Sequence, residues 1–65
     1  MDVTPVVAYQ LMQETTGHCV GFHVDAASDR DAVRFASEWH STHRGQTVIM
    51  RDERGGRVSI VAKFE

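Results

Sequence analysis

The 65-residue sequence predicts a small α+β domain of two β-hairpins and one helix, in the order ββαββ. Three observations predict it: four segments alternate in side-chain polarity, one segment has apolar residues at helical spacing, and the length allows one domain only. The hydrophobic fraction of 42% and charged fraction of 25% are ordinary for a folded chain and exclude a disordered one. We expect the helix to pack on one face of a four-stranded, mainly antiparallel sheet.

The first hairpin is predicted from two alternating segments, residues 6–13 and 18–25, which a turn at residues 14–17 separates. The turn ends in Gly17, and glycine readily adopts the positive φ that a short hairpin needs. Strands joined by so short a turn pair antiparallel.

The helix is predicted to begin after Ser28, whose hydroxyl can accept a backbone amide, with Asp31 as the acidic member of a capping box. It is predicted to end at Gly45. The residues spaced three and four apart on its apolar face are Ala32, Phe35, Ala36, Trp39 and His43.

The second hairpin is predicted from residues 46–52 and 57–64, joined by a turn at residues 53–56. Together with the first hairpin it predicts one sheet face that packs on Phe35, Ala36 and Trp39 of the helix. The strand residues assigned to that face are Val7, Tyr9, Leu11, Val20, Phe22, Val24, Val48, Met50, Val58, Ile60, Ala62 and Phe64.

One helix cannot cover both faces of a sheet, so the other face is predicted to be open. The residues assigned to it are Val6, Ala8, Gln10, Met12, Cys19, Gly21, His23, Ile49, Arg51, Val61 and Lys63. A contiguous exposed apolar patch usually serves as an interaction site. We therefore expect Met12, Ile49 and Val61 to anchor a protein partner or a second copy; the alternative is scattered apolar side chains that only meet solvent.

The second hairpin also carries Arg51, Arg54 and Arg57, with Lys63 further along its last strand. Guanidinium groups around a turn can bind carboxylates or phosphates, so this hairpin is a second expected contact. No aromatic residue lies among the arginines to stack on bases, and the net charge of −2 has the wrong sign for a general nucleic-acid binder. Nucleic acid is thus the weaker prediction, and a solvated hairpin stays an alternative.

The histidines and Cys19 are residue types that bind zinc, but their arrangement does not favour a site. His18 and Cys19 are adjacent on a strand and project to opposite faces, and Cys19 and His23 lie roughly 13 Å apart along it. The sequence also lacks a glycine-rich phosphate loop and a nucleophile elbow. We expect no metal, no cofactor and no catalytic activity.

Neither a secretion signal at residues 1–5 nor a membrane-spanning apolar run is expected from the sequence. The single cysteine, Cys19, cannot form an internal disulfide, which fits a reducing cytoplasm. We therefore expect a cytoplasmic protein that has no contact with a membrane.

Three sequence features resemble small bacterial and phage ββαββ proteins over roughly residues 20–64. They are an acid-Ala-Ser-like end of the second strand, the Ala-spaced segment 31–36, and Gly-x-x-Val-x-x-Arg-Asp at residues 45–52 before a glycine turn. One similar group comprises uncharacterised bacterial proteins, and the other comprises phage anti-CRISPR inhibitors. The second resemblance implies a stoichiometric inhibitor that docks on a host CRISPR surveillance complex and obstructs its nucleic-acid channel.

The function expected from these features is a non-enzymatic protein-interaction module, with the open sheet face and the arginine hairpin as contacts. If it is phage-encoded, it acts in the host cytoplasm. The alternative is a small homodimeric bacterial regulatory or nucleic-acid-binding domain that pairs through the same sheet face.

Overall fold

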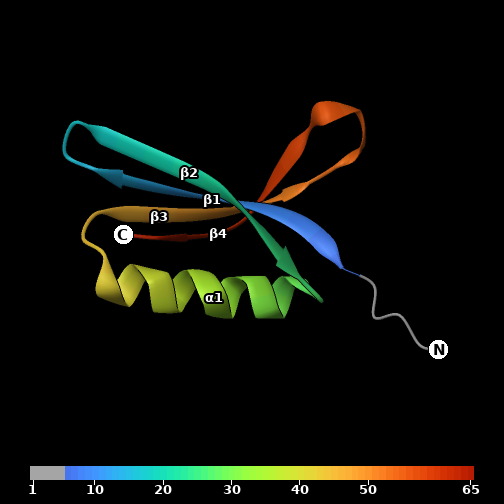
Figure 1. The fold of residues 1–65 in the computed structure, drawn as a ribbon, viewed down its shortest axis with the longest axis horizontal. Helices are drawn as coiled ribbons and strands as arrows, with labels where there is room; N and C mark the ends of the chain where they lie inside the picture. Colours follow the sequence, from blue (N-terminus) through green and yellow to red (C-terminus); the bar gives the residue numbers. More distant parts are fainter. Residues whose placement is uncertain (1–5) are drawn as a thin grey trace.

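The structure, a computed structural model, describes residues 6–65 and confirms the predicted α+β fold (Figure 1). Its elements are β1 (Val7–Thr15), β2 (His18–Ala26), α1 (Asp29–Thr42), β3 (Gln46–Asp52), the short 3-10 helix η1 (Arg54–Gly56) and β4 (Val58–Phe64). The four strands form one antiparallel sheet with α1 along one face. Residues 1–5, for which the sequence predicts no secretion signal, lie outside the described residues.

The first hairpin is longer than predicted because β1 continues through Thr15. Its strands pair in one unbroken register from Val7 opposite Ala26 to Thr15 opposite His18. Gly17 has a φ of 78° in the turn, so the residue expected to need a positive φ does adopt one.

The strand order is β2-β1-β3-β4, which places β1 and β3 in the centre and leaves β2 and β4 as the two edges. β1 pairs antiparallel with β3 from Tyr9 opposite Arg51 to Glu14 opposite Gln46. The tip of the β3–β4 hairpin bends away from α1 and stands clear of the remaining sheet (Figure 1).

The helix begins as predicted, because Ser28 Oγ accepts the backbone amide of Asp31 at 3.3 Å. It ends at Thr42, before the predicted end at Gly45. Gly45 has a different role: with a φ of 107°, it passes so close to β1 that an added Cβ would lie 2.0 Å from the carbonyl oxygen of Glu14. A glycine is therefore needed where the chain enters β3.

The core lies between α1 and the two central strands. Its fully buried apolar members are Tyr9, Leu11, Ala32, Ala36 and Ile49. The two alanines let the helix approach the sheet closely, and the partly buried residues around them are Val7, Phe22, Val24, Ala26, Val33, Trp39, Val61, Ala62 and Phe64. The predicted core contribution of the first hairpin is confirmed except at Val20, which is 56% exposed.

The predicted faces of β3 were wrong. Ile49, expected on the open face, is fully buried opposite Leu11, and Val48 and Met50 lie on the open face instead. Both faces of this strand carry apolar residues, so alternation alone could not decide which one meets the helix. The buried Gln13 of β1 decides it, because its Oε1 accepts the hydroxyl of Thr47, which shares a face with Ile49.

The predicted faces of β4 were wrong in part because the strand contains a β-bulge. Ile49 pairs with Ala62 whereas Met50 pairs with Ile60, which leaves Val61 as the extra residue. Val61, expected to face outward, therefore packs against the core. Ile60 and Val58, expected in the core, lie on the open face and are 59% and 46% exposed.

The helix of the described chain is neither long enough nor apolar enough to cross a membrane.

Candidate functional site

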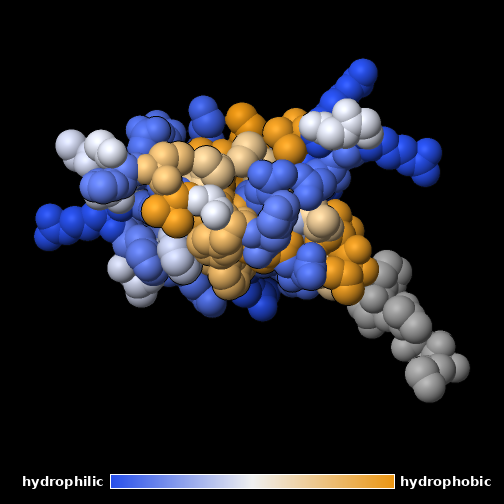
Figure 2. Space-filling model, turned by 45° about the horizontal axis from the view of Figure 1, so that its top comes forward, coloured by the Kyte–Doolittle hydropathy of each residue, from blue (hydrophilic) through white to orange (hydrophobic). Residues whose placement is uncertain are grey.

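The open face of the sheet carries a contiguous apolar cluster at its centre. The strand register brings four residues of β1, β3 and β4 together, and we call them the methionine patch: Met12, Val48, Met50 and Ile60. Ile60 is 59% exposed and the other three are half-buried. Figure 2 shows apolar surface gathered over the middle of this face, with hydrophilic side chains on its flanks.

The side chain of Met12 lies across β2 above Gly21, its pairing partner. A Cβ added at Gly21 would lie only 2.5 Å from Met12 Sδ, so the glycine makes room for the thioether. Because methionine is flexible and polarisable, a surface with two of these side chains can adapt to an irregular partner.

Charged residues form a rim on the same face as the methionine patch. The rim consists of Glu14, Asp25, Asp52 and Lys63, placed there by strand alternation. Asp52 Oδ1 accepts a hydrogen bond of 2.6 Å from Gln10 Nε2, which fixes one of these carboxylates beside the patch. Three acids against one base give the rim a net negative charge.

Arg51 does not join the other two arginines, contrary to the predicted cluster. Its Nη1 lies 2.7 Å from Asp29 Oδ2, on the side of the sheet that faces α1, and its Nε lies 2.6 Å from Glu53 Oε1. The carboxylates of Glu53 and Asp29 raise the pKa of Arg51 above its ordinary value. Arg51 is thus engaged within the fold, and its predicted exposure to a partner on the open face is wrong.

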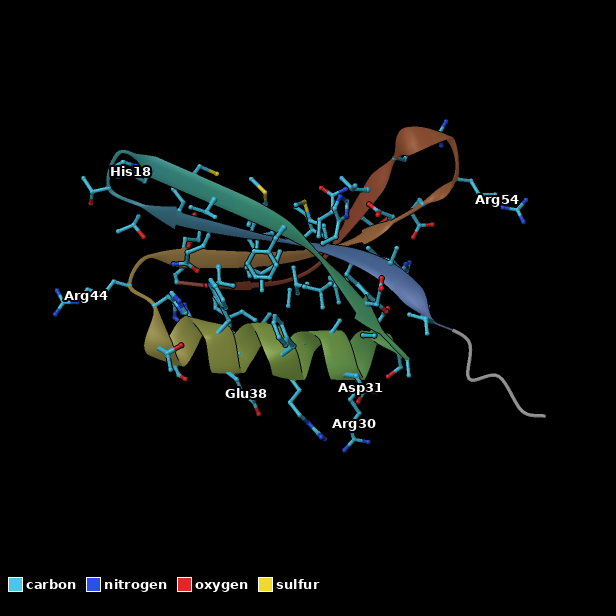
Figure 3. All side chains as sticks on the ribbon, in the orientation of Figure 1. His18, Arg30, Asp31, Glu38, Arg44 and Arg54 are labelled. Atoms are coloured by element: carbon cyan, nitrogen blue, oxygen red, sulfur yellow. The ribbon has the colours of Figure 1, made fainter. Side chains whose placement is uncertain are left out.

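Arg54 and Arg57 are exposed at the β3–β4 tip, as predicted, and Figure 3 shows Arg54 extending into solvent. Together with Glu53, Val58 and Ser59 they line a shallow depression beside the end of the open face. Lys63 is exposed on β4 and pairs with Val48, which places this residue at the edge of the methionine patch.

Tyr9, Asp29 and Arg51 form a polar clamp between the sheet and the start of α1. Tyr9 is fully buried, and its hydroxyl donates a hydrogen bond of 2.5 Å to Asp29 Oδ1. Burial and the neighbouring carboxylate raise the pKa of Tyr9 to about 12. The same hydrogen bond and Arg51 lower the pKa of Asp29. The clamp therefore joins β1, α1 and β3, with the phenol held protonated and the carboxylate and guanidinium held charged.

A second polar cluster fixes the end of α1. Gln13 Nε2 and Thr15 Oγ1 both donate to the carbonyl oxygen of Arg44, at 2.6 and 2.8 Å. His40 Nδ1 lies 3.3 Å from Thr47 Oγ1. These contacts and the hydrogen bond between Thr47 and Gln13 provide hydrogen-bond partners for the buried polar residues of β1 and β3.

The histidines and the cysteine lie apart. His43 stacks on Trp39 with ring centroids 3.7 Å apart, whereas Cys19 is exposed on β2. Among residues 6–65, no three His, Cys, Asp or Glu side chains are grouped so that they could hold a metal ion.

Of the residues predicted to bind a partner, the structure therefore brings Met12 and Lys63 to one surface and leaves Arg54 and Arg57 at the nearby tip. Ile49, Val61 and Arg51 face the core or α1. Sequence reasoning missed Val48, Met50 and Ile60. Gln13 could have revealed them, because it lies on the same face of β1 as Tyr9 and Leu11. A buried polar side chain there needs a hydrogen-bond partner on the buried face of the neighbouring strand, and that partner is Thr47.

Comparisons of the chain with protein-family models, with curated proteins and with solved structures found no match.

Proposed function

We propose that this chain is a non-enzymatic protein-binding domain that docks on its partner through the methionine patch. The observation that supports this proposal is an uncovered sheet face with four contiguous apolar side chains inside a charged rim. Protein interfaces commonly have such an arrangement, with an apolar centre that becomes dry and a polar border that stays wet.

The charge of the rim favours a partner with basic groups. Glu14, Asp25 and Asp52 outnumber Lys63 on this face, so arginines or lysines around an apolar protrusion would complement it. Proteins that line a nucleic-acid channel carry basic groups of this kind. The resemblance to anti-CRISPR inhibitors implies such a target, and a subunit of a CRISPR surveillance complex is the partner we propose.

The exposed Arg54 and Arg57 are proposed as a second contact beside the patch, toward carboxylates of the same partner. The alternative of a nucleic-acid-binding domain has less support, because Arg51 is paired with Asp29 and Glu53 and only two arginines remain free for phosphates at the tip. Binding that weakens steeply with salt and disappears after nuclease treatment would favour that alternative.

Ile60→Asp tests the proposal because it places a charge in the patch at a residue that is 59% exposed, where water can solvate the carboxylate. The matched control is Val20→Asp, since Val20 is 56% exposed but belongs to the opposite face. Tagged wild type should recover a stoichiometric, nuclease-resistant protein complex from the host lysate. The recovered partner, once purified, should bind Ile60→Asp about 10- to 100-fold more weakly in a one-to-one titration and bind Val20→Asp normally.

Equal affinity of wild type and Ile60→Asp would contradict the proposed surface. A partner other than a CRISPR complex that is still lost with Ile60→Asp would support the surface and contradict the proposed target. The folding control is circular dichroism of both variants, whose spectra should match that of the wild type.

A further inference from the structure

The two edges of the sheet differ in how well they are protected against pairing with another strand. Edge strand β4 has a bulge at Val61 and carries Lys63, two features that discourage further pairing. Edge strand β2 pairs with β1 without a register shift along its whole length of 9 residues. Its sequence contains no proline, lysine or arginine, so β2 is the edge that is open to another strand.

Apolar surface lies next to this edge on the side of α1. Val20 of β2 is 56% exposed and Phe35 of α1 is 39% exposed. Phe35 contacts Phe22 edge to face, with ring centroids 6.4 Å apart, and Phe22 also contacts Trp39 at 4.8 Å. The helix therefore leaves part of this aromatic cluster uncovered beside β2.

We propose that β2 pairs antiparallel with β2 of a second copy of this chain, about a two-fold axis at Phe22. Phe22 is the midpoint of His18–Ala26, so this register pairs the whole strand. The two sheets then form one continuous sheet with both helices on the same side. A two-fold interface requires a surface that complements itself, which here means that apolar residues face apolar residues and that no like charges face each other.

On the helix side, the register places Val20 opposite the partner's Val24 and Phe22 opposite the partner's Phe22. On the open face, Cys19 lies opposite the partner's Asp25. Asp25 is the one acidic residue of β2, which has no lysine or arginine, so no like charges face each other across the interface.

The pairing would enlarge a core that has only five fully buried apolar residues in the described chain. Domains of this size are marginal, and association commonly supplies the missing burial. The methionine patch lies on the opposite face from Val20 and Phe35. The methionine patches of both copies thus stay free. Dimerisation and binding of the partner protein therefore use different surfaces.

The mass in solution tests the pairing. Sedimentation equilibrium of the full chain between about 10 μM and about 1 mM should give a dimer, because even weak association is populated in that range. Val20→Asp should shift the protein to a monomer, since two introduced charges would lie beside the two-fold axis. Ile60→Asp should remain a dimer. A monomeric wild type, or a dimer that Val20→Asp leaves unchanged, would overturn the proposal.

Mild oxidation of Asp25→Cys tests the register. The introduced thiol should form an intermolecular disulfide with Cys19 of the second copy, because residues directly opposite in antiparallel strands have a suitable Cα separation. Two controls should not crosslink: wild type, and Asp25→Cys combined with Cys19→Ser. In each control the two thiols of a dimer lie about six residues apart along the paired strands, roughly 20 Å.

The same offset excludes a disulfide between Cys19 and the introduced thiol within one chain. Crosslinking of either control, or none of the Asp25→Cys protein, would contradict the pairing centred on Phe22. Because Val20→Asp should lose the dimer and keep the partner, failure of this inference is distinguishable from failure of the proposed function.

Discussion

Tyr9 shows how one buried side chain joins three elements. It lies on β1, donates to Asp29 at the start of α1, and through Asp29 is linked to Arg51 of β3. Its ring fills the core between these elements while its hydroxyl satisfies the carboxylate at the helix start. A single residue thus contributes both apolar burial and a charge-assisted hydrogen bond.

Tyr9→Phe should lower the free energy of unfolding by about 1–2 kcal/mol at neutral pH, because it removes this hydrogen bond and keeps the ring. The wild type should also lose stability at alkaline pH. The pKa of Tyr9 is raised from 10.0 to about 12 in the fold, so its contribution is complete below pH 10 and is lost as pH rises to about 12.

Urea denaturation of both proteins at several pH values measures this effect. Tyr9→Phe should lack the alkaline loss between pH 10 and about 12. If both proteins lose stability equally there, burial and the hydrogen bond to Asp29 do not raise the pKa of Tyr9.

Among the elements, β3 is the one whose orientation decides which side chains form the proposed binding surface. Ile49 faces the helix and is fully buried, whereas Ile60, from the neighbouring strand, is 59% exposed on the open face. The same residue type therefore occupies opposite environments within one hairpin.

The substitution of isoleucine by valine at each position tests this orientation with one chemical change. Ile49→Val should lower the free energy of unfolding by about 0.5–1.5 kcal/mol, because it removes a buried methyl group and leaves a small cavity. Ile60→Val should change it by less than about 0.5 kcal/mol. Thermal or chemical denaturation measures both, and a larger loss at Ile60 would mean that the faces of the hairpin are reversed.

The features of the fold that depend on local sequence pattern were predicted from the sequence. The alternation in residues 6–13 and 18–25, the Ser28 cap and the helical spacing of Ala32 and Ala36 all correspond to observed elements. What depends on distant pairing was not predictable. The order β2-β1-β3-β4 and the bulge at Val61 arise from contacts between segments far apart in the chain, and alternation within one strand does not report them.

The candidate site was predictable in kind but not in full composition. A single helix on a four-stranded sheet requires an open face, and Met12 was assigned to it correctly. The partners of Met12 in the patch depend on which face of β3 meets the helix. Val48 and Met50 are as apolar as Ile49, so either face of β3 could have packed against α1. Only the hydrogen bond between Thr47 and Gln13 distinguishes these two orientations.

At the scale of the whole molecule, the fold separates three surfaces. The methionine patch occupies the open face, Arg54 and Arg57 occupy the hairpin tip, and the free backbone of β2 lies at one edge. The proposed pairing at β2 would therefore leave the methionine patch free to bind the proposed partner. A dimer would present two methionine patches on one side of the continuous sheet.

The most direct test of the central claim is a methyl NMR titration of the protein, labelled at methionine and valine methyl groups, with its purified partner. We predict that the methyl resonances of Met12, Met50 and Val48 shift or broaden when the partner is added, whereas those of Val20 on the opposite face do not. Shifts at Val20 with unchanged resonances of Met12 and Met50 would contradict the claim that the open sheet face is the binding surface.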